Sequence, residues 1–337
     1  MPSALLPAAL FAMDPVHLPA LFPPPLMARL RELARIDLDL VVRDFADPAL
    51  AAALAESEVL ITGWGCPRLD GAALAAMPRL RTVLHAGGSV RHLVGEAFWQ
   101  RGRTVSSAVQ ANALPVAEYT LAAILLAGKG AFTLAERYRL GHARPTAGEV
   151  AGLGNLGRRV GVIGASRVGR RVMELLRPFD LALSLHDPYV GDATAAALGA
   201  VPLALDDLLR GSDIITLHAP DTAETYRMLD RARLALIPDG GVLINTARGN
   251  LVDHEALTDE LAGGRISAVL DVTVPEPLPA GSPLYRLPNV FLTPHIAGSI
   301  GNELERLGRT VMAELERLAA GLPLAHQVRP ADLATSA

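Results

Sequence analysis

The chain is poor in cysteine and in aromatic residues, and neither sign of charge dominates it. It has one cysteine, Cys66, among 337 residues, which excludes an internal disulfide and a metal cluster held by cysteines alone. Only 4% of the residues are aromatic while 50% are hydrophobic, so alanine, leucine and valine must build the core. The formal net charge of −4 offers no general attraction to nucleic acid or anionic lipid. These totals predict a globular protein of a reducing compartment, with no nucleic-acid partner.

The chain also lacks a long uncharged hydrophobic run. Its most apolar stretch, ALPVAEYTLAAILLAG, contains Glu118, so no membrane partner is predicted. The apolar N-terminus, residues 1–13, has no Lys or Arg before its hydrophobic part and is interrupted by Pro7. This favours a first buried strand over a signal peptide. We therefore predict a cytoplasmic protein.

Short β-branched runs alternate with amphipathic helical stretches, a pattern typical of parallel sheets with crossover helices. The length of 337 residues favours two domains. A long helix is predicted over 112–128; because it is apolar nearly all round, it should be buried or pressed against a partner. Residues 141–157 read as a glycine-rich connector, and the tail beyond Pro330 as loose. Strands are predicted at 4–13, 57–63, 80–86 and 104–108, and then at 157–164, 181–187, 213–219, 240–247, 266–272 and 289–295.

The six later strands, separated by short loops and helices, describe a doubly wound domain, and the first of them leads into a dinucleotide-type turn. Gly164 permits a tight turn, and Gly169 lets the following helix pack close to the strand. Ser166 replaces the middle glycine, where its Cβ crowds a pyrophosphate slightly although its hydroxyl can donate to a phosphate oxygen. The helix N-terminus offers free N–H groups to the phosphates. The segment therefore predicts a dinucleotide site.

The next predicted strand ends at Asp187. A carboxylate in this place can accept hydrogen bonds from the adenine ribose hydroxyls, and it repels a 2′-phosphate. Asp187 therefore favours NAD over NADP as the cofactor. The alternative interpretation is a turn or cap residue before Pro188.

Three polar residues follow later strands: Arg248 in INTARGNLVD, Glu276 in LDVTVPEP and His295 in LTPHIAG. Taken singly, each has a structural explanation: a salt bridge at the sheet edge, a solvated loop charge and a structural histidine. Ligands of open α/β sheets, however, bind outside the carboxyl ends of the strands, where all three residues fall. We therefore predict that they form one catalytic group.

Reduction of a 2-keto acid has a use for each of these three residue types. An imidazole such as that of His295 can donate the proton that the carbonyl oxygen needs, and a carboxylate on its far ring nitrogen holds the tautomer. A guanidinium can bind the substrate carboxylate and polarise the carbonyl. Asp271, at another strand end, could hold the nicotinamide carboxamide, or could be a cap or loop charge. No metal site is expected, because no histidine or cysteine ligand spacing lies near this group.

These residues lie in motifs that together resemble the D-isomer-specific 2-hydroxyacid dehydrogenases. The motifs, over about residues 112–300, are NALPVAEYTLAAILLA, GRRVGVIGASRVGRRV, SDIITLHAPDTAET, LINTARGNLVD, LDVTVPEP and LTPHIAG. The resemblance implies that Arg248 binds substrate and that Glu276 supports His295, the acid/base. It also implies cofactor contacts at Arg167, Val168, Asp187, Pro220, Thr246, Ala247, Asp271 and Gly298.

The resemblance further implies two doubly wound parallel-sheet α/β domains. A Rossmann NAD-binding domain, residues 113–298, would be inserted into a flavodoxin-like substrate domain, residues 1–112 plus 299–337. The cleft between the domains would hold the substrate, and closure would exclude water. Family members commonly form homodimers through the cofactor domain, with the helix around 115–128 among the exchanged contacts.

The first domain resembles the family less clearly. Its loop LHAGGSVRHL stands where family members read closer to RAGVGVDNID, so Ser89 and Arg91 replace the usual Gly and Asp. Gly87 and Gly88 are candidates to offer backbone N–H groups to the substrate carboxylate, and the alternative is a tight turn after a strand. Trp64 is a candidate for the cleft, although a place in the core is favoured.

The sequence therefore predicts an NAD-dependent dehydrogenase of small 2-keto and 2-hydroxy acids, of glyoxylate or hydroxypyruvate type. Two other interpretations keep the fold. One is an NAD-responsive dimeric binding protein like the C-terminal-binding corepressors, although the catalytic set here is complete. The other is oxidation of another small donor: Glu276 before Pro277 argues against formate, whose enzymes typically have Gln there, and phosphite is less firmly excluded.

Overall fold

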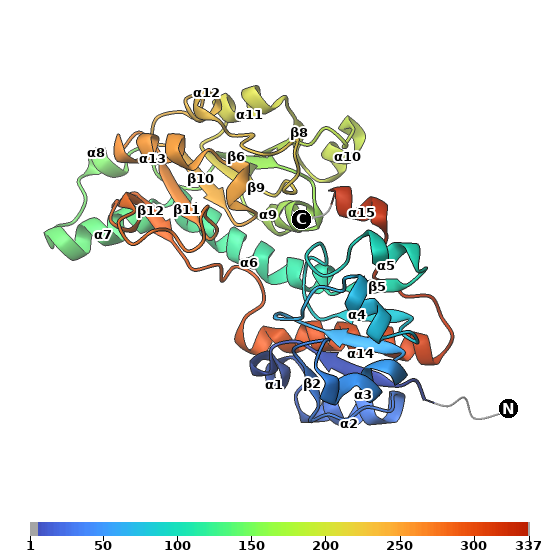
Figure 1. Cartoon of the computed structure of the whole chain (residues 1–337). Coiled ribbons are helices and arrows are strands. Elements are labelled where there is room, and N and C mark those ends of the chain that lie inside the picture. Colours follow the sequence, from blue (N-terminus) through green and yellow to red (C-terminus); the bar gives the residue numbers. More distant parts are fainter. Residues whose placement is uncertain (1–5, 336–337) are drawn as a thin grey trace. The chain divides into compact units, whose positions relative to one another are not determined.

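Residues 6–335, which the computed structural model describes, form two compact units, each built around one β-sheet (Figure 1). Unit 1 consists of residues 6–112 and 299–335, and unit 2 of residues 113–298. The predicted fold class, α/β with two parallel-sheet units, is confirmed.

The sheet of unit 1 has six strands in the order β13-β5-β4-β3-β1-β2. Neighbours pair in parallel except β13, which runs antiparallel to β5. The strands are β1 (Ala9–Ala12), β2 (Val41–Val42), β3 (Val59–Thr62), β4 (Thr82–His85), β5 (Thr104–Ser107) and β13 (Gln327–Val328). The helices are α1 (Leu18–Leu21), α2 (Pro24–Leu33), α3 (Ala51–Glu56), α4 (Gly71–Ala76), α5 (Glu96–Gln100), α14 (Leu304–Ala319) and α15 (Pro330–Thr335).

Strand β1 illustrates why unit 1 has a core on both sides of its sheet. Alternate side chains of a strand point to opposite faces. Phe11 packs into the cluster that contains α1, α2 and α14, while Leu10 packs into the cluster that contains α3, α4 and α5. The predicted first strand is thus buried, although residues 1–5 of the N-terminal segment lie outside the described residues.

The sheet of unit 2 has seven parallel strands in the order β12-β11-β10-β9-β6-β7-β8. The strand order reverses between β6 and β9, and the loops at the carboxyl ends on either side of this point form the usual ligand site of such sheets. The strands are β6 (Arg158–Ile163), β7 (Leu181–His186), β8 (Val201–Pro202), β9 (Ile214–Leu217), β10 (Val242–Asn245), β11 (Ser267–Leu270) and β12 (Val290–Leu292).

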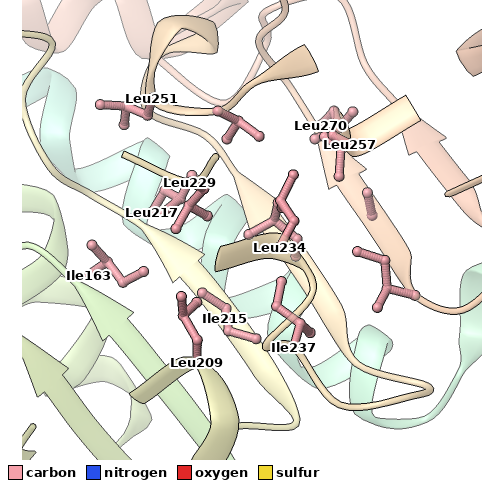
Figure 2. Close-up of a cluster of buried hydrophobic side chains, with 14 of the residues drawn as sticks. Ile163, Leu209, Ile215, Leu217, Leu229, Leu234, Ile237, Leu251, Leu257 and Leu270 are labelled. Carbon is pink, nitrogen blue, oxygen red and sulfur yellow. The ribbon is translucent and has the colours of Figure 1, made fainter. Parts of the chain in front are cut away.

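Helices cover both faces of this second sheet. On one face, Ile215 and Leu217 of β9 pack with Leu234 and Leu257 in a cluster of leucine and isoleucine side chains (Figure 2). Besides α6 (Val109–Gly128), which begins in unit 1, the helices of unit 2 are α7 (Ala131–Gly141), α8 (Ala147–Val150), α9 (Arg167–Leu176), α10 (Asp192–Ala197), α11 (Leu205–Gly211), α12 (Arg231–Leu234) and α13 (His254–Ala262). Short 3-10 turns include η3 (Gly249–Leu251), η4 (Pro283–Tyr285) and, in unit 1, η1 (Pro15–His17), η2 (Pro48–Leu50) and η5 (Gly301–Glu303).

Helix α6 (Val109–Gly128) begins shortly before the predicted start at residue 112 and ends as predicted. Ala117, Ile124 and Ala127 are buried among the core side chains of unit 2. This burial accounts for one apolar face of the helix. It is the one helix among residues 6–335 that is long and apolar enough to cross a membrane by length and composition, and 50% of that stretch is buried.

Several short elements differ from the sequence prediction. Strands β2, β8 and β13 were not predicted, because a strand of 2 residues carries no hydrophobic alternation. The connector at 141–157 contains α8, which starts with a capping box of Thr146 and Glu149. The tail predicted to be loose contains α15, whose Leu333 packs against the core of unit 1.

Candidate active site

The proposed catalytic residues all follow strands of unit 2 at the carboxyl edge of its sheet. Arg248 follows β10, Glu276 follows β11 and His295 follows β12. Because these three strands are parallel neighbours, the loops after them emerge at the same edge. The fold therefore gathers onto one edge residues that are far apart in sequence.

The structure brings His295 and Glu276 into direct contact. Nδ1 of His295 lies 2.7 Å from Oε1 of Glu276, and the two side chains are 50% and 42% exposed. A carboxylate can only accept, so Nδ1 carries the proton and Nε2 is the nitrogen left to face a ligand. The backbone of His295 is left-handed, with φ 55°, which is uncommon outside glycine. Such a backbone persists only where its surroundings hold it.

Hydrogen bonds to Asp271 stabilise the backbone conformation of the His295 loop. Asp271 is 2% exposed, and its carboxylate accepts from Thr293 Oγ1 at 2.7 Å, Ile296 N at 2.8 Å and Ala297 N at 2.9 Å. Its backbone carbonyl accepts from the amide of His295 at 2.9 Å. These bonds support the loop-charge interpretation of Asp271. Its Oδ2 accepts one bond and retains a lone pair, so a contact with a nicotinamide amide is compatible with them.

Asn245 organises the Arg248 loop in a comparable way. Its buried side chain accepts from Ala247 N at 3.0 Å and donates to the carbonyl of Arg248 at 2.9 Å. Arg248 is half-buried, and its guanidinium donates to the carbonyl of Ala247 at 2.6 Å. A Cβ on Gly249 would lie 2.5 Å from the backbone of Thr273, so glycine lets this loop touch the one that carries Glu276.

A cavity of about 610 Å³ adjoins the His295–Glu276 pair within unit 2. Its walls are mostly apolar, and neither Lys nor Arg is among the residues that line it. The apolar part comes from Pro277, Leu278, Leu284, Tyr285, Val290, Phe291, Leu292 and Pro294. No group of three or more His, Cys, Asp or Glu side chains within residues 6–335 is arranged to hold a metal ion.

The turn between β6 and α9 fits a dinucleotide pyrophosphate on steric grounds. Gly164 has φ +96°, and a Cβ there would lie 2.6 Å from Ala219 N; one on Gly169 would lie 2.1 Å from Gly164 O. Ser166 caps α9, its Oγ accepting from Gly169 N at 3.3 Å, and the hydroxyl proton stays available to a phosphate.

Two amides of that turn remain open to an anion. Arg167 and Val168 begin α9 and have no carbonyl four residues earlier in the helix to bond, which is the usual basis of phosphate binding at a helix N-terminus. Both residues were predicted as cofactor contacts.

Asp187 hydrogen bonds to the protein at both carboxylate oxygens. Oδ2 accepts from Ala165 N at 2.7 Å, and Oδ1 accepts from Tyr189 N at 2.8 Å. These bonds support the turn interpretation and tie the end of β7 to the phosphate turn. Each oxygen retains a lone pair for a ribose hydroxyl, so the two interpretations are compatible.

The other predicted cofactor contacts lie at the same edge of unit 2. Pro220 follows β9 and is half-buried, while Thr246 and Ala247 follow β10 and are 7% and 8% exposed. Thr246 Oγ1 lies 3.0 Å from Thr120 Oγ1 of α6. Gly298 is half-buried and closes the His295 loop.

In unit 1, Gly87 and Gly88 follow β4, and they differ in whether neighbouring atoms leave room for a side chain. A Cβ on Gly87 would lie 2.5 Å from Nε2 of buried His85, whereas one on Gly88 would meet only the Asn112 side chain, at 3.7 Å. Burial lowers the pKa of His85 to about 3, with a smaller contribution from His92, so its ring is neutral. Residue 87 must therefore be glycine, because its backbone lies so close to this ring.

The sequence was also interpreted at two further residues of unit 1, Arg91 and Trp64. Arg91, which replaces the usual Asp, donates to the carbonyl of Leu333 in α15. Trp64 is half-buried and packs against the α1–α2–α14 cluster, with its ring 5.4 Å from that of His17. Its contacts agree with the core interpretation.

Sequence reasoning missed Asn245, Thr293 and Tyr119, which hydrogen bond to the two site loops or within them. Their signal in the sequence is slight: Asn245 is a polar residue that ends a buried strand, and Tyr119 is a polar residue in an apolar helix.

Comparison with known proteins decides the family. The model of the D-isomer specific 2-hydroxyacid dehydrogenase family, NAD binding domain, matches residues 121–297, more than half of the chain. The chain belongs to this family. The matched region contains every strand of unit 2.

Relatives of this family differ in length. D-3-phosphoglycerate dehydrogenase of Mycobacterium tuberculosis is 37% identical over 271 residues, 80% of this chain and 50% of the relative. Glyoxylate/hydroxypyruvate reductase B of Yersinia enterocolitica is 32% identical over 258 residues, 75% of this chain and 78% of the relative. The chain thus spans about half the length of the first curated relatives it matches.

Solved structures agree with this assignment. A putative D-isomer specific 2-hydroxyacid dehydrogenase of Polaromonas sp. is 28% identical, with a TM-score of 0.75 over 96% of this chain and 100% of that chain. A protein of Thermus thermophilus gives 29% identity and a TM-score of 0.77 over 95% of this chain and 100% of that chain.

Proposed function

We propose that this protein is a cytoplasmic, NAD-dependent oxidoreductase that interconverts small 2-keto acids and D-2-hydroxy acids. The observation that carries the proposal is the 2.7 Å contact of His295 Nδ1 with Glu276 Oε1 at the edge of an NAD-binding domain. Arg248, on a loop packed against the Glu276 loop, supplies the cation that a carboxylate substrate needs.

In this proposal His295 is the acid and base, and its Nε2 exchanges a proton with the substrate oxygen. During reduction, Nε2–H donates to the carbonyl oxygen as it becomes a hydroxyl; during oxidation, neutral Nε2 takes the hydroxyl proton. Glu276 keeps the ring in the tautomer that leaves Nε2 facing the substrate. Arg248 binds the substrate carboxylate. The backbone amides of Gly87 and Gly88 in unit 1 are kept as proposed substrate contacts.

The proposed cofactor residues are those of the sheet edge. Gly164, Ser166, Arg167, Val168 and Gly169 would hold the pyrophosphate. When bound, NADH supplies the hydride that the carbonyl carbon receives. The ribose and nicotinamide contacts proposed from the resemblance are Asp187, Pro220, Thr246, Ala247, Asp271 and Gly298.

We also propose a homodimer formed through α6. Leu126 is 45% exposed on a helix whose other face is buried in unit 2, so a partner would cover apolar surface. Sedimentation of the chain at micromolar concentration tests this, and a monomer mass would contradict it.

The substrate favoured is a small keto acid of glyoxylate or hydroxypyruvate type. Support comes from the Yersinia relative, of which this chain covers most of the length. A phosphorylated acid is the second candidate, because relatives at 37% identity are D-3-phosphoglycerate dehydrogenases.

A keto-acid panel tests the proposal. The protein is mixed with NADH or NADPH and with glyoxylate, hydroxypyruvate, pyruvate, a bulkier keto acid or phosphohydroxypyruvate, and the loss of reduced cofactor is followed by absorbance. Turnover is expected with NADH and at least one unphosphorylated acid. If the protein binds NADH and turns over none of these acids, the proposal is wrong, and a nucleotide-responsive binding protein becomes the better interpretation.

A further inference from the structure

Two neighbouring polar residues of α6 hydrogen bond to the two loops that carry the proposed catalytic residues. Tyr119 OH lies 2.8 Å from Oγ1 of Thr293, in the His295 loop. Thr120 Oγ1 lies 3.0 Å from Oγ1 of Thr246, in the Arg248 loop. All of these residues belong to unit 2. One helix thus contacts both loops through adjacent residues.

The direction of the first contact follows from counting protons. The carboxylate of Asp271 can only accept, so Thr293 gives its hydroxyl proton to Oδ1 at 2.7 Å. Thr293 Oγ1 must then be the acceptor for Tyr119, which donates its phenolic proton. Burial raises the pKa of Tyr119, and the charge of Asp271 adds to this, while the bond to Thr293 lowers it. The phenol therefore remains a donor at neutral pH.

The hydrogen-bonded chain ends at the group that shapes the His295 loop. The same Asp271 oxygen accepts from the amide of Ile296, and the other oxygen accepts from the amide of Ala297. His295, with its left-handed backbone, lies in sequence between Thr293 and Ile296, which both bond to Asp271. Tyr119 thus donates to the Thr293 oxygen, whose own proton is given to Asp271. This bond limits how far Asp271 and the loop amides can shift.

We propose that Tyr119 is a positioning residue for His295, acting from α6 through Thr293 and Asp271. This inference rests on the proposed function, since it concerns how the acid/base is held. Tyr119 does not touch the imidazole; it fixes the loop that presents Nε2. Misplacement of a proton donor by a fraction of an ångström slows the chemical step without changing the groups that bind the substrate.

The first experiment removes one hydroxyl. Tyr119→Phe keeps the ring and deletes the donor, and kcat with the best keto acid is expected to fall about three- to tenfold, the effect of one neutral hydrogen bond. The KM for the keto acid and the NADH dissociation constant should stay within about twofold, because Arg248 and the phosphate turn are untouched. Tyr138→Phe, on the exposed surface of α7, is the matched control and should behave as wild type.

A double-mutant cycle tests the route of the effect. Thr293→Val removes both bonds of the chain and should lower kcat about tenfold or more, while Thr293→Ser keeps the hydroxyl and should restore most of it. Adding Tyr119→Phe to Thr293→Val should cost less than about twofold further, because the acceptor is already lost. Independent, multiplying effects of the two substitutions would overturn the proposal.

Amide exchange gives a readout that needs no turnover, so this proposal can fail or succeed separately from the proposed function. In Tyr119→Phe, deuterium uptake at Ile296 and Ala297 should rise several-fold, while the core strands of unit 2 stay protected. Unchanged exchange at these amides overturns the proposal. Faster exchange throughout unit 2 also overturns it, since Tyr119 would then be a general stability residue.

Discussion

Loops that follow strands in the two units are held in different ways. In unit 2, hydrogen bonds between backbone groups and the buried side chains of Asn245 and Asp271 fix the Arg248 and His295 loops. In unit 1, the loop at Gly87 lies against the ring of His85, whose Nδ1 bonds to Thr62 at 2.9 Å. The first arrangement depends on side-chain hydrogen bonds. The second depends on steric contact with a ring and on a backbone bond, in which the amide of Ala108 donates to the carbonyl of Gly87 at 2.9 Å.

The difference corresponds to what each loop presents. A hydrogen-bonded loop restricts its backbone in both distance and direction, so a side chain such as His295 leaves it at a defined angle. A loop packed on a neutral, buried ring is restricted mainly in how closely it approaches that ring, which suits the backbone N–H groups that Gly87 and Gly88 are proposed to offer. Three substitutions test whether the hydrogen-bonded loops determine chemistry and the packed loop determines stability.

The largest effect is expected from His295→Ala. Removing the proposed acid/base should lower kcat with the best keto acid by about a thousandfold or more, while the NADH dissociation constant stays within about twofold. Steady-state kinetics and the quenching or enhancement of NADH fluorescence measure the two quantities. Glu276→Gln keeps the shape of the partner and should lose less than His295→Ala.

That result would be contradicted if His295→Ala retained more than about a tenth of wild-type turnover, since general acid–base catalysis is worth at least about a hundredfold. The loop would then be ordered for another purpose, such as binding.

An intermediate effect is expected from Asn245→Ala. The substitution leaves the amide of Ala247 and the carbonyl of Arg248 without their buried partner, at about 1–3 kcal/mol for each group. Because Arg248 is proposed to bind the substrate carboxylate, kcat/KM should fall about 30- to 100-fold, chiefly through a higher KM. Kinetics on a keto-acid series measure this.

Asn245→Asp is the matched control for that variant. It keeps the oxygen that accepts from Ala247 and loses the donor to Arg248, so an intermediate KM is expected. An Asn245→Ala enzyme with wild-type KM and reduced kcat would mean that this loop, like the His295 loop, acts on the chemical step.

The sequence predicted the fold where hydrophobic periodicity was long enough to read. Strands of four to six residues, such as β6 and β9, were found, while the two-residue edge strands β2, β8 and β13 were not. Edge strands this short are defined by their partner and not by their own side chains. The inserted arrangement of the domains came only from the family resemblance, because no local pattern reports on it.

The candidate site was predicted where a residue's place relative to a strand was informative. Arg248, Glu276 and His295 were proposed because polar residues after parallel strands meet at one edge. The direction of the Asp271 carboxylate was not predictable from the sequence. It bonds to amides of the His295 loop, which depends on contacts between the end of β11 and the residues after β12. The bond of Tyr119 to Thr293 joins residues 174 apart in sequence, so no local pattern could report it.

The smallest effect is expected from Gly87→Ala in unit 1. The added Cβ would lie 2.5 Å from His85 Nε2, and the ring cannot move aside because it is buried and bonded to Thr62. Such overpacking costs about 1–3 kcal/mol of unfolding free energy. Gly88→Ala is the matched control one residue away: its Cβ has an ordinary contact at 3.7 Å, and the change should be neutral or stabilising by up to about 1 kcal/mol.

Tryptophan fluorescence during urea unfolding isolates this effect, because the chain has 2 tryptophans and both, Trp64 and Trp99, belong to unit 1. The Gly87→Ala transition should shift to lower urea relative to Gly88→Ala, while NADH binding by unit 2 is unchanged in both variants. Equal midpoints for the two variants would mean that the loop yields to the added methyl group. Packing against His85 would then not be what fixes it, and the contrast between the two kinds of loop would be lost.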